Sequence, residues 1–121
     1  MLALVLALQL AAADIAVIDG DTVDVGEVRY RVAGLDAPEI QNARCLAERR
    51  LGQVAKARAE QLLAGAATIE LEETGRVQPA TERYRERREA RLLIDGADLA
   101  ALLIGEGLAQ APGRRRWCNG L

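Results

Sequence analysis

The chain has 121 residues, of which 50% are apolar and 28% are charged, and its formal net charge is −2. This length fits one domain with a single modest core, and the composition is typical of a globular protein and excludes a disordered one. The absence of histidine excludes Ser-His and Cys-His catalysis and zinc sites with imidazole ligands, so any acid–base chemistry comes from carboxylates, arginines, tyrosines or metal-bound water.

The first thirteen residues, MLALVLALQLAAA, are an uncharged apolar run that is too short to span a bilayer. Three small residues, Ala11 to Ala13, stand where a secretory signal is cleaved, although the usual positive charges before the run are missing. We expect a signal peptide or apolar leader over residues 1–13, with a first strand or an uncleaved anchor as alternatives. The domain would then cover residues 14–121, and the protein would be periplasmic or secreted.

Five segments have the β-branched composition or the period-two alternation of short strands: residues 15–19, 21–25, 28–35, 67–73 and 90–95. Two segments repeat apolar residues at helical spacing: residues 44–63 and 97–109. Gly65 is the expected end of the first helix. Asp95 or Asp98 is the expected N-cap of the second helix, and Gly105 and Gly107 are expected to end it. Residues 74–83 are expected to form a loop, and the tail after the second helix is expected to be irregular.

This order of elements gives no regular alternation of strands and helices, so a parallel sheet is not expected. Three strands, a helix, two strands and a helix fit a small, mostly antiparallel barrel. We therefore predict a mainly β (α+β) domain, a five-stranded OB-fold barrel with packed helices. No segment predicts a stable membrane span, and we expect a monomer.

Charge is unevenly distributed along the chain. Residues 14–39 hold seven acids against two bases, and residues 76–91 hold six arginines against three acids. A further basic run, Arg114 to Arg116, lies near the end. Opposed acidic and basic segments focus a field locally even when the total charge is small. The alternative interpretation is an arginine-rich solvated surface.

Strand phase distinguishes some of these acids. Asp21 alternates with Val23 and would point toward the core side of its strand, where an unpaired carboxylate is costly. Asp36 and Glu39 follow at the end of the next strand, and together with main-chain carbonyls such acids predict a hard-cation site. The alternative is that Asp19 and Asp21 are turn residues whose side chains bond the local backbone.

Arg31 lies in the predicted strand that precedes these later acids, five residues before Asp36. Its guanidinium could reach a phosphate beside the proposed cation. Alternatively, it neutralises Asp21 or Glu39, and spacing does not separate the two roles.

Four segments, VIDGDTV, YRVAGLDAPE, TERYRERREARLLIDG and ADLAALLIGEGLA, resemble the staphylococcal nuclease (thermonuclease) family in order and spacing. The resemblance covers about residues 15–110, and the motifs D-G-D-T and R-x₄-D-x-P-E are specific when they occur together. It implies an OB barrel with helices. It also implies a Ca²⁺-dependent phosphodiesterase that cuts DNA and RNA and leaves 3′-phosphate ends.

By position, the resemblance implies that Asp21, Asp36 and the main-chain carbonyl of Ala37 bind calcium. The family usually has threonine at position 37, and alanine keeps the carbonyl. Glu39 would be the general base and Arg31 would grip the scissile phosphate. Asp19 would lie just behind the calcium ligands.

The resemblance also implies a second catalytic arginine, but more than one residue matches it. The family usually has Tyr-Gly-Arg before the last strand, whereas this chain has a longer segment there without glycine. Counting back from the turn after the last strand selects Arg87, whereas counting forward from Tyr84 selects Glu86. We choose Arg87, with Arg85 and Arg88 as alternatives. Tyr84 and Arg85 are expected to contact the substrate.

Few aromatic residues are present to stack on bases, and Arg114 to Arg116 could instead follow the phosphate backbone. The two cysteines, Cys45 and Cys118, suit a disulfide in an oxidising compartment, and two free buried thiols are the alternative. The expected function is thus a Ca²⁺-dependent nuclease. The alternatives are a non-catalytic OB-fold nucleic-acid-binding module and a calcium-stabilised structural domain.

Overall fold

A computed structural model of the protein describes residues 7–114 and 116–118. The described elements are β1 (Ala7–Leu10), a 3-10 turn (Ala12–Asp14), β2 (Ile15–Asp19), β3 (Thr22–Val25), β4 (Val28–Val32), α1 (Leu46–Ala64), β5 (Ile69–Gln78), β6 (Arg87–Ile94), β7 (Ala97–Asp98) and α2 (Leu99–Gly105). Residues 1–6 of the expected leader and Arg115 of the basic run lie outside the described residues.

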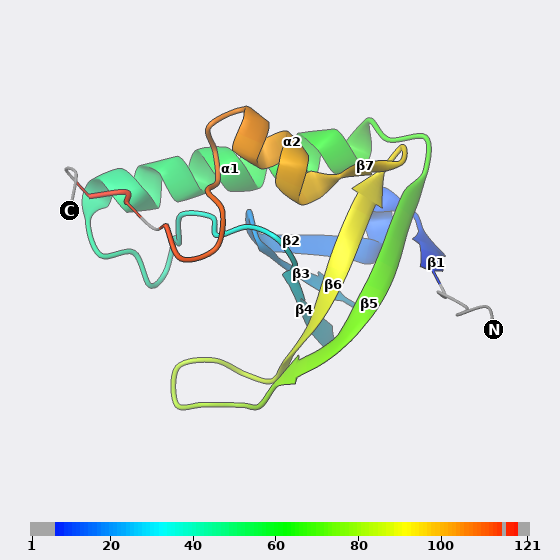
Figure 1. The fold of residues 1–121 in the computed structure, drawn as a ribbon, viewed down its shortest axis with the longest axis horizontal. Helices are drawn as coiled ribbons and strands as arrows, with labels where there is room; N and C mark the ends of the chain where they lie inside the picture. Colours follow the sequence, from blue (N-terminus) through cyan, green and yellow to red (C-terminus); the bar gives the residue numbers. More distant parts are fainter. Residues whose placement is uncertain (1–6, 115, 119–121) are drawn as a thin grey trace.

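The strands form one curled sheet in the order β1-β5-β6-β4-β3-β2, and the two-residue β7 pairs with β6 (Figure 1). The pairing of β4 with β6 is parallel, and the other pairings are antiparallel. Figure 1 shows both helices at one end of the curled sheet. The fold is therefore mainly β, a mixed α+β arrangement of a half-barrel sheet and two helices.

The five predicted strands correspond to β2 to β6, and the described residues add β1 and β7 to them. Residues 7–10 of the expected leader form β1, which pairs with residues 69–72 of β5. The leader over residues 1–13 stays a prediction. Within the described part of the chain, no helix has both the length and the apolarity needed to cross a membrane.

The expectation of a loop over residues 74–83 was wrong in its first half, because β5 continues to Gln78. Glu73 pairs with Ala90 and Val77 pairs with Arg88, and the register shifts between these pairs, where Gly75 has a φ of +93°. Residues 73–78 are exposed. A strand that is solvated on both faces lacks the apolar alternation from which strands are predicted.

Capping residues mark the end of α1 and the beginning of α2. Gly65 is the C-cap of α1, as predicted, and its N–H donates to the Gln61 carbonyl at 3.1 Å. Asp98, not Asp95, is the N-cap of α2 and accepts a hydrogen bond from the Ala100 N–H at 3.1 Å. The helix ends at Gly105, as expected from Gly105 and Gly107, and Gly107 turns the chain at a φ of +76°.

The core lies between the concave side of the sheet and the helices. Its largest fully buried aliphatic side chains come from β3, β4, β6, α2 and the segment after β4: Val23, Val32, Leu35, Leu92, Leu99 and Leu103. Because this core fixes how the sheet curls, it also fixes where the ends of β2, β3 and β4 meet.

A disulfide joins Cys45, the N-cap residue of α1, to Cys118 in the C-terminal segment, with a Cα–Cα distance of 6.0 Å. The two residues are 73 positions apart. A crosslink that closes a loop of this length removes much of the conformational freedom of the unfolded chain.

Reduction of this disulfide is expected to lower the free energy of unfolding by about 4 kcal/mol, because the closed loop is long. Denaturant unfolding followed by circular dichroism, with and without reductant, measures the effect. The double variant Cys45→Ser/Cys118→Ser is the control and should match the reduced protein and ignore reductant. Equal unfolding midpoints for the oxidised and reduced wild type would contradict the expectation.

Candidate active site

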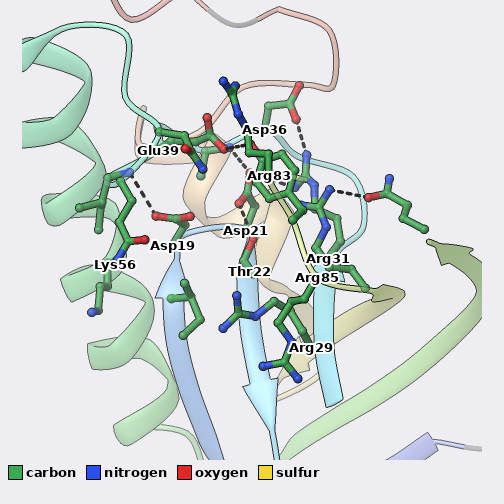
Figure 2. Close-up of a pocket in the computed structure, with 18 residues that line it drawn as sticks. Asp19, Asp21, Thr22, Arg29, Arg31, Asp36, Glu39, Lys56, Arg83 and Arg85 are labelled. Carbon is green, nitrogen blue, oxygen red and sulfur yellow. Dashed lines mark hydrogen bonds and ion pairs between the residues drawn. The ribbon is translucent and has the colours of Figure 1, made fainter. Parts of the chain in front are cut away.

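A pocket of about 520 Å³ opens where the ends of β2, β3 and β4 face two loops (Figure 2). One loop follows β4 and the other precedes β6. The residues that the resemblance assigned to calcium binding, catalysis and substrate contact all line this pocket: Asp19, Asp21, Arg31, Asp36, Ala37, Glu39, Tyr84, Arg85 and Arg87. The fold therefore brings together acids and arginines that are far apart in sequence. Arg114 and Arg116 of the basic run line a separate pocket together with Gln110.

The centre of the pocket is an arginine between two carboxylates. Arg31 Nη1 lies 2.9 Å from Asp21 Oδ2, and Arg31 Nη2 donates to Asp36 Oδ1. Nη1 also donates to the Leu35 carbonyl at 3.0 Å. The guanidinium thus ties the end of β3 to the turn that follows β4.

Asp21 is 7% exposed, in agreement with its alternation with Val23. Its Oδ2 accepts a hydrogen bond from the Ala37 N–H at 2.8 Å, and its Oδ1 accepts one from Thr22 Oγ1 at 3.1 Å. Burial raises the pKa of this carboxyl, while Arg31 and the hydrogen bonds oppose that rise. The Ala37 N–H is sixteen residues away, so the backbone group that Asp21 bonds belongs to a distant loop and not to its own turn.

Asp19 also bonds this distant loop, because its Oδ1 accepts a hydrogen bond from the Ile40 N–H at 3.2 Å. Burial raises the pKa of Asp19 to about 6, and the negative charges of Asp21 and Glu39 add to the rise. Lys56, on the polar side of α1, lines the pocket and opposes it. The three acids therefore share one electrostatic environment.

Asp36 is held by the C-terminal segment, which sequence reasoning did not connect to the site. Its backbone forms an isolated β-bridge with Gln110, with N···O distances of 2.8 and 2.9 Å. Its Oδ2 accepts a hydrogen bond from the Gly113 N–H at 2.9 Å. The sequence carries no local signal of this contact, because Asp36 bonds to the backbone of residues more than seventy positions away.

Glu39 meets the second loop through Tyr84, whose hydroxyl donates to Glu39 Oε1 at 2.7 Å. Burial, together with Glu39, raises the pKa of this phenol. The guanidinium of Arg87 lies over the Tyr84 ring, 4.4 Å from its centroid, and its Nη2 donates to Gln78 Oε1 at 2.6 Å. Arg87 Nε is buried and has no hydrogen-bond partner among the described residues.

The other arginines of the basic segment differ in position. Arg85 lines the pocket, and its Nη2 donates to the Glu27 carbonyl at 2.7 Å. Arg88 pairs with Glu73 at 3.4 Å and is not among the lining residues. Arg83 also lines the pocket and was missed, although its place in the arginine-rich segment was a signal.

The pocket's donor set suits a hard cation in part. Asp21 and Asp36 direct carboxylate oxygens to one guanidinium, and carboxylates with main-chain carbonyls are the ligands that Ca²⁺ prefers. Among the described residues, no group of three or more acidic or cysteine side chains is arranged to hold a metal ion. Further ligands would be the carbonyl of Ala37 and water.

Comparison with protein-family models and with curated proteins gives no match for this chain. The resemblance to the thermonuclease family therefore rests on the sequence motifs given above.

The raised pKa of Asp19 predicts a pH-dependent stability in the presence of chelator. Between about pH 4 and pH 6 the folded state binds more protons than the unfolded state, so stability falls as pH rises through this window. We expect a loss of about 1–2 kcal/mol, which is below the full value of the shift because Asp19 is partly exposed to screening solvent. Urea unfolding at several pH values measures this loss.

Asp19→Asn should remove most of that dependence, because the amide does not titrate. Asp24→Asn is the control, since Arg29 lowers the pKa of Asp24 and the stability that it contributes is lost as pH falls. The same slope in wild type and Asp19→Asn between about pH 4 and pH 6 would show that Asp19 is not the group responsible.

Proposed function

We propose that this protein is a calcium-dependent nuclease that hydrolyses phosphodiester bonds in DNA and RNA. The observation that carries the proposal is the convergence of acids and two arginines on one pocket: Asp21, Asp36, Glu39, Arg31 and Arg87. Carboxylates that hold a hard cation, a carboxylate base and guanidinium groups are together sufficient for this chemistry without imidazole.

The arginines are suited to bind and stabilise phosphate. Arg31 presents a planar fork that matches phosphate oxygens, and Arg87 keeps a buried Nε without a partner among the described residues. Both would neutralise the charge that grows on the phosphoryl oxygens. A bound calcium ion, held by Asp21, Asp36 and the Ala37 carbonyl, would supply further positive charge there.

Glu39 is the proposed general base, which takes a proton from the attacking water. The Tyr84 hydroxyl fixes one of its carboxylate oxygens at 2.7 Å, so the carboxylate is oriented before the substrate arrives. Arg87 stacks on the same tyrosine ring, so the side chains proposed for phosphate binding and for the base both contact Tyr84.

We also propose that the scaffold is a partly open OB barrel. The order of β2 to β6 and the helix between β4 and β5 are consistent with that fold, which often binds nucleic acid. The disulfide supports an oxidising compartment, periplasmic or secreted. A monomer with DNA and RNA as its substrates remains the simplest proposal.

Cleavage of plasmid DNA and of RNA should require Ca²⁺ and stop when EGTA is added. Glu39→Gln should lower kcat by about 10²- to 10⁴-fold, because the amide cannot accept the proton of the attacking water. The matched control is Glu60→Gln, an exposed residue of α1 outside the pocket, which should cleave like the wild type. Undiminished cleavage in EGTA or by Glu39→Gln would overturn the mechanism. Binding of single-stranded DNA without any cleavage would favour the non-catalytic module.

Three arginine variants test the register of the basic loop. Arg87→Ala should lower kcat by about 10²-fold or more, because it removes a guanidinium that stabilises developing charge. Arg88→Ala should change kcat less than about threefold, since its exposed ion pair with Glu73 lies outside the pocket. Steady-state kinetics of both, with Arg85→Ala, decides the assignment. If Arg85→Ala is the most severe, Arg87 is the wrong residue.

A further inference from the structure

Glu48, in the first turn of α1, is a charged residue with no solvent exposure. No motif in the sequence singled it out, and it does not line the pocket. Removing a carboxylate from water is expensive unless hydrogen bonds and charges compensate it. A fully buried acid of this kind therefore marks a place where the fold needs a hydrogen-bond acceptor.

The carboxylate of Glu48 accepts hydrogen bonds from both ends of the loop that carries the proposed base. Its Oε2 accepts from the Glu39 N–H at 3.0 Å, and its Oε1 accepts from the Arg44 N–H at 3.0 Å. The positive end of the α1 dipole favours a negative charge at this position. One side chain thus holds the backbone at both the first and the last residue of the 39–44 loop.

One turn further along α1, Gly52 makes a second contact with the same loop. A Cβ atom at Gly52 would lie 2.9 Å from the carbonyl oxygens of Pro38 and Glu39. Such a distance is shorter than side-chain carbons adopt, so the glycine permits the helix to lie directly against this backbone. Two successive turns of α1 therefore hold the backbone of Glu39.

We propose that Glu48 is a positioning residue for Glu39, a role that rests on the nuclease function proposed above. By holding the Glu39 backbone N–H, it sets where the Glu39 side chain leaves the loop and meets the Tyr84 hydroxyl. A misplacement of a catalytic group by about 1 Å costs up to about a hundredfold in rate. Glu48 is fully buried outside the pocket, so the role proposed for it is exerted through Glu39.

Glu48→Gln tests the role, because an amide offers one acceptor oxygen where two backbone N–H groups need one each. We expect kcat to fall by about 10- to 100-fold, with KM and the calcium concentration for half-maximal activity changed by less than about threefold. In the Glu39→Gln background the same change should alter kcat by less than about twofold, since the residue through which it acts is already removed. Equal losses in both backgrounds would overturn the proposal.

Leu63→Ala is the matched control for a purely structural effect, because Leu63 is a buried residue at the far end of the same helix. It should lower the free energy of unfolding by about 2–5 kcal/mol and leave the kcat of the folded protein within about threefold. If Leu63→Ala lowers kcat as much as Glu48→Gln at equal fractions folded, Glu48 is a structural residue only.

Amide hydrogen exchange provides a measurement that does not depend on nuclease activity. In Glu48→Gln, exchange at Glu39 and Arg44 should become faster by about tenfold or more relative to exchange in α1, and in Leu63→Ala it should not. Faster exchange in a protein without nuclease activity would refute the proposed function and keep the loop-holding role. Unchanged exchange would refute the positioning role itself.

Should Glu48→Gln fail to fold, Gly52→Ala replaces it in the same three measurements. Its Cβ presses on the Pro38 and Glu39 carbonyls and leaves the Glu48 side chain in place. The expected result is again a lower kcat with little change in KM, and an unchanged kcat would overturn the proposal.

Discussion

The pocket depends on the burial of one carboxylate, that of Asp21. A buried acid needs partners, and here they are the Arg31 guanidinium and the Ala37 N–H. Arg31 in turn holds Asp36 and the Leu35 carbonyl. Because the buried Asp21 carboxylate needs these partners, the segment after β4 folds back over the beginning of β3. This return brings Asp36 and Glu39 to the pocket.

The loop that carries these acids is held from outside the sheet as well. Asp36 is paired with Gln110 in the C-terminal segment, and Glu39 is held by Glu48 in the first turn of α1. The disulfide joins that turn to the C-terminal segment. The helix and the tail therefore form one support for the loop, whose own short sequence could not fix the positions of Asp36 and Glu39.

Much of the fold could be predicted from local patterns, and the pocket residues from these patterns together with the family resemblance. Strand alternation located five of the seven strands of the sheet, β2 to β6, and the alternation of Asp21 with Val23 placed a carboxylate inside. The tip of β5 was missed because it is solvated on both faces. The roles of Glu48 and Gln110 were missed because backbone hydrogen bonds to distant segments leave no periodic trace in the sequence. The contacts that the sequence could not show are thus mostly those that hold the loop of Asp36 and Glu39 in place.

The same ion pairs have a consequence for how the proposed substrate and cation would bind. Arg31 is engaged by the carboxylates of Asp21 and Asp36, and a phosphate would compete with them for its donors. A cation on those carboxylates would weaken their hold on the guanidinium and make it available to phosphate. Because coupling between two binding sites is reciprocal, phosphate on Arg31 would equally favour the cation. An arginine placed between two acids thus links the two binding events, which separate acidic and basic surfaces would not do.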